Sequence, residues 1–403
     1  MWNWDVCLSD SDLGELIGAV RDSEPISGLT HDFYKYPARF TPVFARNLIK
    51  LFTEPGDLVV DPFMGGATTL VEARALGRRC IGVDINELSA FLAQTKTLIF
   101  RKKDLHAVYD WAVNLTGRLN LHKPPVRAQW WIIKGYQKNI NGKNTWPIRK
   151  TLEFILAYLD ELDTVSQRRF ARCVLLKTSQ WALDCTIKIP SAKEFRERFL
   201  QNIIEMSKGA LEFSKAARKS DNLYDSKNPS RTICLNRSAI GIEEEPAVQK
   251  AGPPKLILTS PPYLGVHVLY HRWQIRGRRE TPAPFWIANA EDGCGESFYT
   301  FGYRTNHSRY YEHLLNSYKS LAQIADKNTM LAQMVGFSKP TVQLSKYLKI
   351  IDAAGFSECK IPALANIQDG RLWRSVPNRK WYATQKGSIG SSKEVVLFHK
   401  LKS

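Results

Sequence analysis

Short apolar runs form two groups along this 403-residue chain, and each run predicts a β-strand. Segments with apolar residues at helical spacing lie among them, such as residues 341–355, where Gly355 is typical of a helix end. Strands that alternate with helices predict a doubly wound α/β sheet, mostly parallel and covered on both faces. The predicted strands are residues 57–63 and 79–85 in the first group, and 232–237, 255–260, 330–338 and 393–399 in the second.

Residues 101–228, between the two groups, have a different pattern. Their apolar residues recur at helical spacing with basic residues between them, and strand patterning is almost absent. Residues 219–232 are polar and predict a linker that returns the chain to the sheet. We therefore predict a mostly helical insertion over 101–228, between one half of the sheet in residues 1–100 and the other in residues 229–403.

The charge of the chain favours a polyanionic partner, above all a nucleic acid. Lys and Arg outnumber Asp and Glu by 57 to 39, which gives a formal net charge of +18. No apolar run approaches the roughly 20 residues of a membrane span, and the N-terminus lacks a signal-peptide core. The seven cysteines include no CxxC pair, so they predict neither a disulfide framework nor a zinc site. We expect a cytoplasmic protein without a membrane partner.

The carboxyl ends of the first two predicted strands carry the most informative polar residues. Asp61 ends one strand, a turn with Gly65 and Gly66 follows, and a helix begins near Thr68. Asp84 ends the next strand, at about the 20-residue spacing that suits an acid bound to ribose hydroxyls. A carboxylate beside the turn would repel a pyrophosphate but attract an ammonium group. These features favour S-adenosylmethionine, against the alternative of an ordinary strand–turn–helix unit.

Three motifs resemble those of the amino-group DNA methyltransferases. "DPFMGGATT" (61–69), "GRRCIGVDI" (77–85) and "TSPPY" (259–263) resemble motifs I, II and IV of that family. Residues 35–57 resemble motif X, which completes the cofactor pocket. The resemblance implies a Rossmann-like methyltransferase fold with a seven-stranded sheet, S-adenosylmethionine as cofactor and double-stranded DNA as partner. It also implies a restriction–modification system with a cognate endonuclease that acts on the same site.

The resemblance assigns roles to residues on the cofactor side. Asp61 holds the methionine ammonium group and Asp84 the ribose. Two departures from the family pattern are Ala67, where glycine is frequent, and Arg237-Ser238, where an acidic residue often contacts adenine. The predicted cofactor-binding residues are Tyr36, Pro37, Phe40, Asp61, Phe63, Gly65, Gly66, Thr68 and Asp84.

The residues predicted to grip the target base are Ser260, Pro261, Pro262 and Tyr263. The lone pair of an exocyclic amine is delocalised into the base, so catalysis requires acceptors that hold its N–H groups. The serine hydroxyl and a proline carbonyl suit that purpose, and the Tyr263 ring offers a stacking surface for a flipped base. Serine before the two prolines is the form associated with cytosine N4. The order X–I–II, insertion, IV is usual among adenine enzymes, so adenine N6 remains the alternative.

Several other segments carry candidate chemistry. Residues 127–146 combine amides, cations and aromatics and predict either a target-reading segment or a solvated helix face. No cysteine follows a proline, which argues against carbon-5 methylation of cytosine. His267 and His271 have no apparent third ligand, so we predict no metal site. The arginines predicted to contact DNA phosphates are Arg272, Arg276, Arg278 and Arg279.

Two further readings stay open. Trp381 or Tyr382 could cover the target base or pack in the core. The chain could also be a nucleic-acid-binding protein on a methyltransferase-like fold without turnover, although polar residues at Asp61, Asp84 and Ser260 argue against that alternative.

Overall fold

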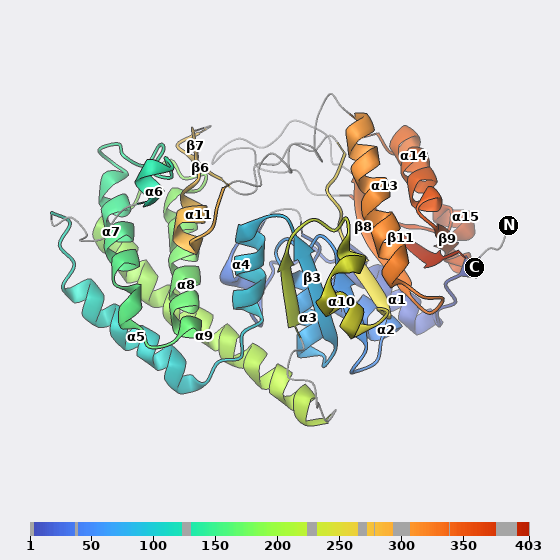
Figure 1. Cartoon of the computed structure of the whole chain (residues 1–403), viewed down its shortest axis with the longest axis horizontal. Helices are drawn as coiled ribbons and strands as arrows, with labels where there is room; N and C mark the ends of the chain where they lie inside the picture. The colour runs from blue at the N-terminus through green and yellow to red at the C-terminus, as the bar shows by residue number, and fades with distance from the viewer. Residues whose placement is uncertain are drawn as a thin grey trace.

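The computed structural model shows a central β-sheet covered by helices on both faces, with a further group of helices beside it (Figure 1). We refer to that further group, α5 to α9 with α11, as the helical layer. The parts of the chain that the structure describes are residues 4–36, 39–122, 130–223, 232–264, 272–277, 279–292, 307–337, 339–375 and 393–402.

The sheet has nine strands, and seven of them follow one path in the order β9-β11-β8-β5-β2-β3-β4. Neighbours along this path are parallel except for β11, which is antiparallel to β8 and β9. This confirms the predicted doubly wound, mostly parallel sheet. The strands of this path are β2 (Leu58–Asp61), β3 (Arg79–Asp84), β4 (Thr232–Asn236), β5 (Leu256–Thr259), β8 (Met330–Phe337), β9 (Phe356–Lys360) and β11 (Lys393–Leu401).

Two short strands extend the predicted sheet. β1 (Trp4–Asp5) pairs with β9, and β10 (Leu372–Ser375) pairs with β11. Their two and four residues are too short to give a period-2 pattern. β9 was also not predicted, because its sequence FSECK has only two apolar residues, Phe356 and Cys359, three positions apart, and so forms neither an apolar run nor a period-2 alternation.

Alternate residues of the strands feed two separate cores. Val59 points to the layer of α1, α2 and α3, whereas Val60 points to the layer of α10, α13 and α14, and both are fully buried. Complete burial of such a side chain stabilises the fold by roughly 1.5–3 kcal/mol. The helices of the two layers are α1 (Asp10–Arg21), α2 (Pro42–Phe52) and α3 (Thr68–Ala75), and α10 (Pro246–Ala251), α13 (His307–Ile324) and α14 (Pro340–Ala353).

The helical layer is joined to the sheet by α4 (Glu87–Lys96) and by the end of α9. Arg74 of α3 donates to both carboxylate oxygens of Asp221 on α9, at 2.9 and 2.7 Å. A β-hairpin, β6 (Trp273–Ile275) and β7 (Arg279–Thr281), packs on this layer although it follows β5 in sequence. The helices of the layer are α5 (Lys102–Gly117), α6 (Trp130–Ile133), α7 (Trp146–Ala157), α8 (Val165–Leu183), α9 (Ala192–Leu223) and α11 (Ala283–Ala288).

The topology selects one place on the sheet for a ligand. From β2 the chain winds outward through β3 to β4, and from β5 it winds the other way to β8. The switch point therefore lies between β2 and β5, and open α/β sheets bind ligands at the carboxyl ends of the strands at such a point. Asp61 ends β2 and Ser260 follows β5 directly. None of the helices in the described ranges combines the length and apolar character needed to cross a membrane.

Candidate active site

Asp61 joins the tips of the two central strands. Its Oδ1 accepts hydrogen bonds from Thr259 Oγ1 at 2.7 Å and from the backbone N–H of Phe63 at 3.1 Å, and its Oδ2 accepts one from Thr69 Oγ1 at 2.7 Å. The residue is only 2% exposed, and burial raises the pKa of its carboxyl to about 6. Oδ2 accepts a single one of these bonds, so it has room for one further donor such as an ammonium group.

The glycine turn after β2 is held from several sides. Gly65 donates its N–H to Asp84 Oδ2 at 2.9 Å, and Ser89 Oγ donates to the same oxygen at 3.1 Å. Lys96 is fully buried and donates from Nζ to the Gly66 carbonyl at 2.8 Å. Burial lowers the pKa of Lys96 to about 7 and raises the pKa of Asp84. The turn is therefore held by hydrogen bonds within the protein, with Ser89 and Lys96 as well as with the predicted Asp84.

Tyr36 packs directly on this turn. A Cβ built on Gly65 would lie 3.1 Å from the Tyr36 ring, and one built on Gly66 would lie 3.0 Å from its Cβ, so side chains at the two positions would crowd it. Phe40 is 5% exposed and meets Phe44 edge to face at 5.4 Å in the core. These contacts bring two of the three predicted motif X residues to the turn or to the core beneath it, whereas Pro37 lies outside the described residues.

Two further observations bear on whether this turn fits the cofactor. The hydroxyl of Thr68, the first residue of α3, is buried and has no hydrogen-bond partner within the described residues, which is expected of a group that meets a polar ligand. Phe63 is partly buried beside Asp61. Ala67 takes a left-handed conformation (φ +64°), one that usually favours glycine, so the departure from the family pattern has left the turn geometry in place. The carboxylate acceptors of Asp61 and Asp84 and the Thr68 hydroxyl fit a ligand with an ammonium group and ribose hydroxyls.

The predicted base-gripping residues follow β5 at the switch point. Ser260, Pro262 and Tyr263 are partly exposed, and Pro261 is buried. Ser260 Oγ donates to Tyr263 Oη at 3.2 Å, and Tyr310 of α13 donates its hydroxyl to the Pro262 carbonyl at 2.9 Å. The Pro262 carbonyl is thus engaged within the protein, which leaves Pro261 as the proline carbonyl best suited to a substrate.

Tyr263 is fixed by two residues that the sequence analysis missed. Its hydroxyl donates to Glu394 Oε1 at 2.9 Å, and Arg374 binds the other oxygen of that carboxylate from Nε at 2.7 Å. Glu394 lies on β11 and is 4% exposed. No local signal identifies it, because "KEVVLFH" predicts only a strand and the contact spans 131 residues of sequence.

The end of β4 differs from the family expectation for adenine contact. Arg237 donates to Glu245 at 3.0 Å and its backbone N–H donates to the Asp84 carbonyl at 3.1 Å, so its side chain is part of the protein structure. Asn236, the register partner of Asp84 on β4, is exposed. Its side-chain Nδ2 also donates to the Asp84 carbonyl, at 3.0 Å. Asn236 is therefore the better candidate for a polar contact with the cofactor's base.

Three of the four arginines predicted to contact DNA, Arg272, Arg276 and Arg279, lie on or beside the β6–β7 hairpin. Arg272 donates to Asp292 at 2.7 and 3.0 Å, so part of its charge is balanced within the protein, while Arg276 and Arg279 are exposed. Backbone bonds from Gln274 to the end of α8 attach the hairpin to the helical layer. Arg278 lies outside the described residues, as do His267, His271, Trp381 and Tyr382. The described ranges hold no group of three or more His, Cys, Asp or Glu side chains positioned for a metal ion.

The aromatic segment predicted for target reading contributes both to the core and to the surface. Trp131 is 6% exposed and stacks on Trp286 of α11, with ring centroids 3.9 Å apart. Its neighbour Trp130 is 37% exposed, and Lys134 lies 5.7 Å from the centroid of that ring. One tryptophan therefore holds α6 to α11, and the other presents an aromatic surface beside Lys134, whose charge is paired with Glu291 at 2.5 Å.

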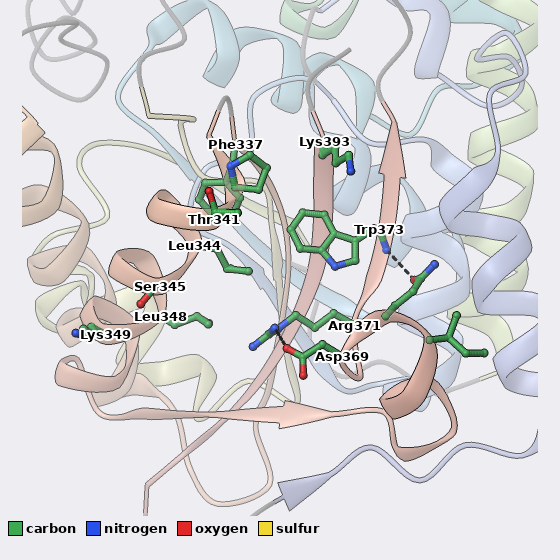
Figure 2. Close-up of a pocket in the computed structure, with 13 residues that line it drawn as sticks. Phe337, Thr341, Leu344, Ser345, Leu348, Lys349, Asp369, Arg371, Trp373 and Lys393 are labelled. Atoms are coloured by element: carbon green, nitrogen blue, oxygen red, sulfur yellow. Dashed lines mark hydrogen bonds and ion pairs between the residues drawn. The ribbon is translucent and has the colours of Figure 1, made fainter. Parts of the chain in front are cut away.

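A separate hollow lies at the β10 edge of the sheet (Figure 2). This cavity of about 1200 Å³ is bordered by α14, by β10 and by the short helix α15 (Ala365–Gln368). Trp373, Arg371 and Leu344 line it, and among the described residues none of those predicted for cofactor or base does. On β11, Lys393 faces this hollow while its neighbour Glu394 meets Tyr263, because successive strand residues point to opposite faces. The hollow is thus distinct from the candidate active site.

Comparison with known proteins gives matches over parts of the chain. The family model described as DNA methylase matches residues 13–94. The type II methyltransferase M.MvaI of Kocuria varians is 28% identical over 255 residues, which cover 58% of this chain and 53% of that protein. M.MjaII of Methanocaldococcus jannaschii, also a type II methyltransferase, is 35% identical over 66 residues, 16% of this chain and 12% of that protein. The DNA adenine methyltransferase YhdJ of Escherichia coli is 35% identical over 69 residues, 17% of this chain and 24% of that protein.

The chain spans about half of M.MvaI and less than a quarter of the other two relatives. Among solved structures, TrmN from Thermus thermophilus is 12% identical with a TM-score of 0.31, covering 92% of this chain and 53% of that one. The matched segment 13–94 contains Asp61, the glycine turn and Asp84. The family model and the type II relatives support the resemblance drawn from the motifs: the chain is similar to the amino-group DNA methyltransferases, a family whose cofactor is S-adenosylmethionine.

Proposed function

We propose that this protein is a site-specific DNA methyltransferase that transfers a methyl group from S-adenosylmethionine to the N4 amino group of cytosine in duplex DNA. The observation that carries the proposal is the 2.7 Å hydrogen bond from Thr259 to Asp61. It joins the carboxyl end of β2, where the cofactor's ammonium group would lie, to the residue directly before Ser260. Cofactor and base would therefore meet at the switch point of the sheet.

On the cofactor side, Asp61 Oδ2 would hold the ammonium group and Asp84 the ribose hydroxyls. S-adenosylmethionine, when bound, supplies an electrophilic methyl group. Ser89 and Lys96 hold the turn at Gly65 and Gly66 in place, so little ordering free energy is lost when the ligand binds. Tyr36 packs against the same turn and would form one wall of the pocket.

On the base side, Ser260 Oγ and the Pro261 carbonyl would accept hydrogen bonds from the amino group of a flipped base. Two acceptors draw the nitrogen toward a tetrahedral geometry, in which its lone pair is no longer delocalised into the ring. The fixed φ of Pro261 and Pro262 preorganises these acceptors. The nitrogen would form its bond to the methyl carbon as the carbon–sulfur bond breaks and leaves its electron pair on sulfur, and the nitrogen would then release one N–H proton to solvent water.

DNA would contact the exposed part of the helical layer. The exposed Arg276 and Arg279 of the β6–β7 hairpin supply cationic surface, and the exposed Trp130 supplies aromatic surface on the same layer. The type II names of two relatives support a place in a restriction–modification system, with an endonuclease that reads the same DNA sequence.

The experiment incubates the protein with amplified, unmodified DNA and S-adenosylmethionine labelled on the methyl group, followed by digestion to nucleosides. We expect label in N4-methylcytosine. Ser260→Ala should abolish transfer while cofactor binding is retained, and Ser207→Ala on α9 is the matched control. Label in N6-methyladenine would overturn the choice of base, and no incorporation by a protein that binds the cofactor would overturn the activity.

Adenine N6 is the second candidate because the relative YhdJ is a DNA adenine methyltransferase. Its target is also an exocyclic amine, so the same acceptors would serve. The nucleoside digestion separates the two.

A further inference from the structure

Three residues form a row across three strands beneath Tyr263. Gly336 of β8 is the register partner of Glu394 on β11, and Glu394 is the register partner of Arg374 on β10. Directly opposed residues of a sheet lie on the same face. A Cβ built on Gly336 would lie 2.5 Å from Cε2 of Tyr263. The Tyr263 ring therefore lies over β8 at the place where glycine leaves room for it. The Tyr263 hydroxyl thereby reaches Glu394.

The side chains of Arg374, Glu394, Tyr263 and Ser260 are joined by hydrogen bonds in which the donor and the acceptor are fixed at each step. A carboxylate can only accept hydrogen bonds, and Glu394 accepts from Arg374 on Oε2 and from Tyr263 on Oε1. Burial raises the pKa of Tyr263 well above its usual value, so the phenol keeps the proton that it donates. Because that proton is committed to Glu394, the Tyr263 oxygen can only accept from Ser260, at 3.2 Å. The hydroxyl proton of Ser260 therefore points toward Tyr263.

We propose that Glu394 is a positioning residue for methyl transfer, which acts through Tyr263 to orient the Ser260 hydroxyl so that its free lone pairs face the substrate. The inference rests on the proposed function, because it gives that orientation a catalytic purpose. Ser260 oriented in this way accepts a hydrogen bond from an amino group and repels a keto oxygen. This chain of hydrogen bonds from Glu394 through Tyr263 to Ser260, the relay, thus selects bases with an amino group at the ring position that Ser260 contacts (C4 of cytosine or C6 of adenine) over thymine and guanine, which carry a keto oxygen there.

Glu394→Gln tests the direction of the relay with little change of shape. Arg374 donates, so the amide oxygen of this variant would turn to Arg374 and its NH₂ group would face Tyr263. The Tyr263 hydroxyl would then donate to Ser260, and the Ser260 proton would point at the substrate amine. Tyr263→Phe instead removes the relay and leaves the Ser260 hydroxyl free to rotate.

The experiment measures single-turnover methyl transfer to unmodified DNA at saturating cofactor. We expect Glu394→Gln to lower the rate constant at least about tenfold, and Tyr263→Phe to lower it less. In the Tyr263→Phe background, Glu394→Gln should have no further effect, so the double variant should be faster than Glu394→Gln alone. A purely structural role of Glu394 would give the same loss in both backgrounds.

Glu358→Gln is the matched control. Glu358 of β9 pairs with Arg371 at 2.6 and 2.8 Å, as Glu394 pairs with Arg374, but does not contact Tyr263. We expect Glu358→Gln to leave the rate unchanged, and every variant to bind labelled cofactor as the wild type does. Should Glu394→Gln fail to fold, the loss of rate in Tyr263→Phe with unchanged cofactor binding carries the test.

The outcomes separate the relay from the proposed function. An active wild type with equal losses from Glu394→Gln in both backgrounds, or with no loss in either variant, would overturn the relay alone. A wild-type protein that binds cofactor but transfers no methyl group would overturn the proposed function, and with it the catalytic purpose of the relay.

Discussion

Asp61→Asn is the substitution that tests the cofactor site most sharply. The carboxylate is 2% exposed and accepts hydrogen bonds from Thr69, Thr259 and Phe63. Asparagine keeps its shape, and the threonine hydroxyls can rotate to suit an amide, so the main change is the loss of negative charge. If Asp61 holds the ammonium group of the cofactor, affinity for labelled S-adenosylmethionine must fall.

The size of the effect follows from the pKa of about 6. About one tenth of a carboxyl with this pKa is ionised at pH 5 and about nine tenths at pH 7, so wild-type affinity should rise about tenfold between these values. The Asp61→Asn variant should bind at least about tenfold more weakly at pH 7, because hydrogen bonds to charged groups contribute about 1.5–3 kcal/mol. Its affinity should also lose most of this pH dependence.

Fold stability should change with pH in the opposite direction. Burial raises the pKa of this carboxyl from 3.8 to about 6, so the unfolded chain releases the proton at lower pH than the folded one. The free energy of unfolding therefore falls as the pH rises from about 4 to about 6. The decrease reaches about 3 kcal/mol in total and then stays constant at higher pH. Asp61→Asn removes this penalty, so the free energy of unfolding of the variant should rise relative to the wild type over that range. Denaturant titrations at several pH values measure it.

Asp57→Asn provides the control for both measurements. Asp57 precedes β2 at the opposite end of the strand, where it accepts a hydrogen bond from the Glu54 N–H at 2.8 Å. We expect its replacement to leave cofactor affinity unchanged at every pH. A wild-type affinity that is flat from pH 5 to pH 7, or an equal loss in both variants, would refute the assignment of Asp61 to the ammonium group.

Three further predictions concern other parts of the molecule. Gly336→Ala places a methyl group against the Tyr263 ring and should cost roughly 1–3 kcal/mol of stability together with most of the methyl transfer, and an unchanged melting temperature would contradict it. In denaturant titrations, Trp131→Ala should cost about 3–5 kcal/mol because the ring is buried, whereas Trp130→Ala should cost less than about 1 kcal/mol and instead weaken DNA binding. Arg279→Ala should lower DNA affinity and reduce the slope of log K against log salt by about one in anisotropy titrations, and an unchanged slope would exclude a phosphate contact.

Apolar patterning predicted most of the sheet because the central strands are buried on both faces. The runs around Val59, Ile257 and Val396 are apolar throughout, and their residues feed the two cores on either side. The same patterning missed β9, whose two apolar residues are three positions apart, and the very short β1 and β10. Strands of this kind form because a neighbouring strand offers hydrogen bonds, and that neighbour is far away in sequence.

The cofactor side could be proposed from a single stretch because its parts are close together in the chain. Asp61, the glycine turn and Asp84 are joined by one strand–helix–strand unit, and hydrogen bonds such as Gly65 N–H to Asp84 span only 19 residues. The basic hairpin shows the opposite case. Its position near "TSPPY" in sequence suggested a place beside the base, yet it packs on the helical layer through Gln274 and Asp184, 90 residues apart.

The sequence by itself determined the central strands of the sheet, the order of its motifs and the residue types at the tips of β2, β3 and β5, since these depend on local spacing and on apolar runs. Only the tertiary structure decided which of these residues are bound to one another. The Thr259–Asp61 bond spans 198 residues and the Tyr263–Glu394 bond spans 131. Such contacts form when distant strands are brought into register within one sheet, and no local pattern encodes that register.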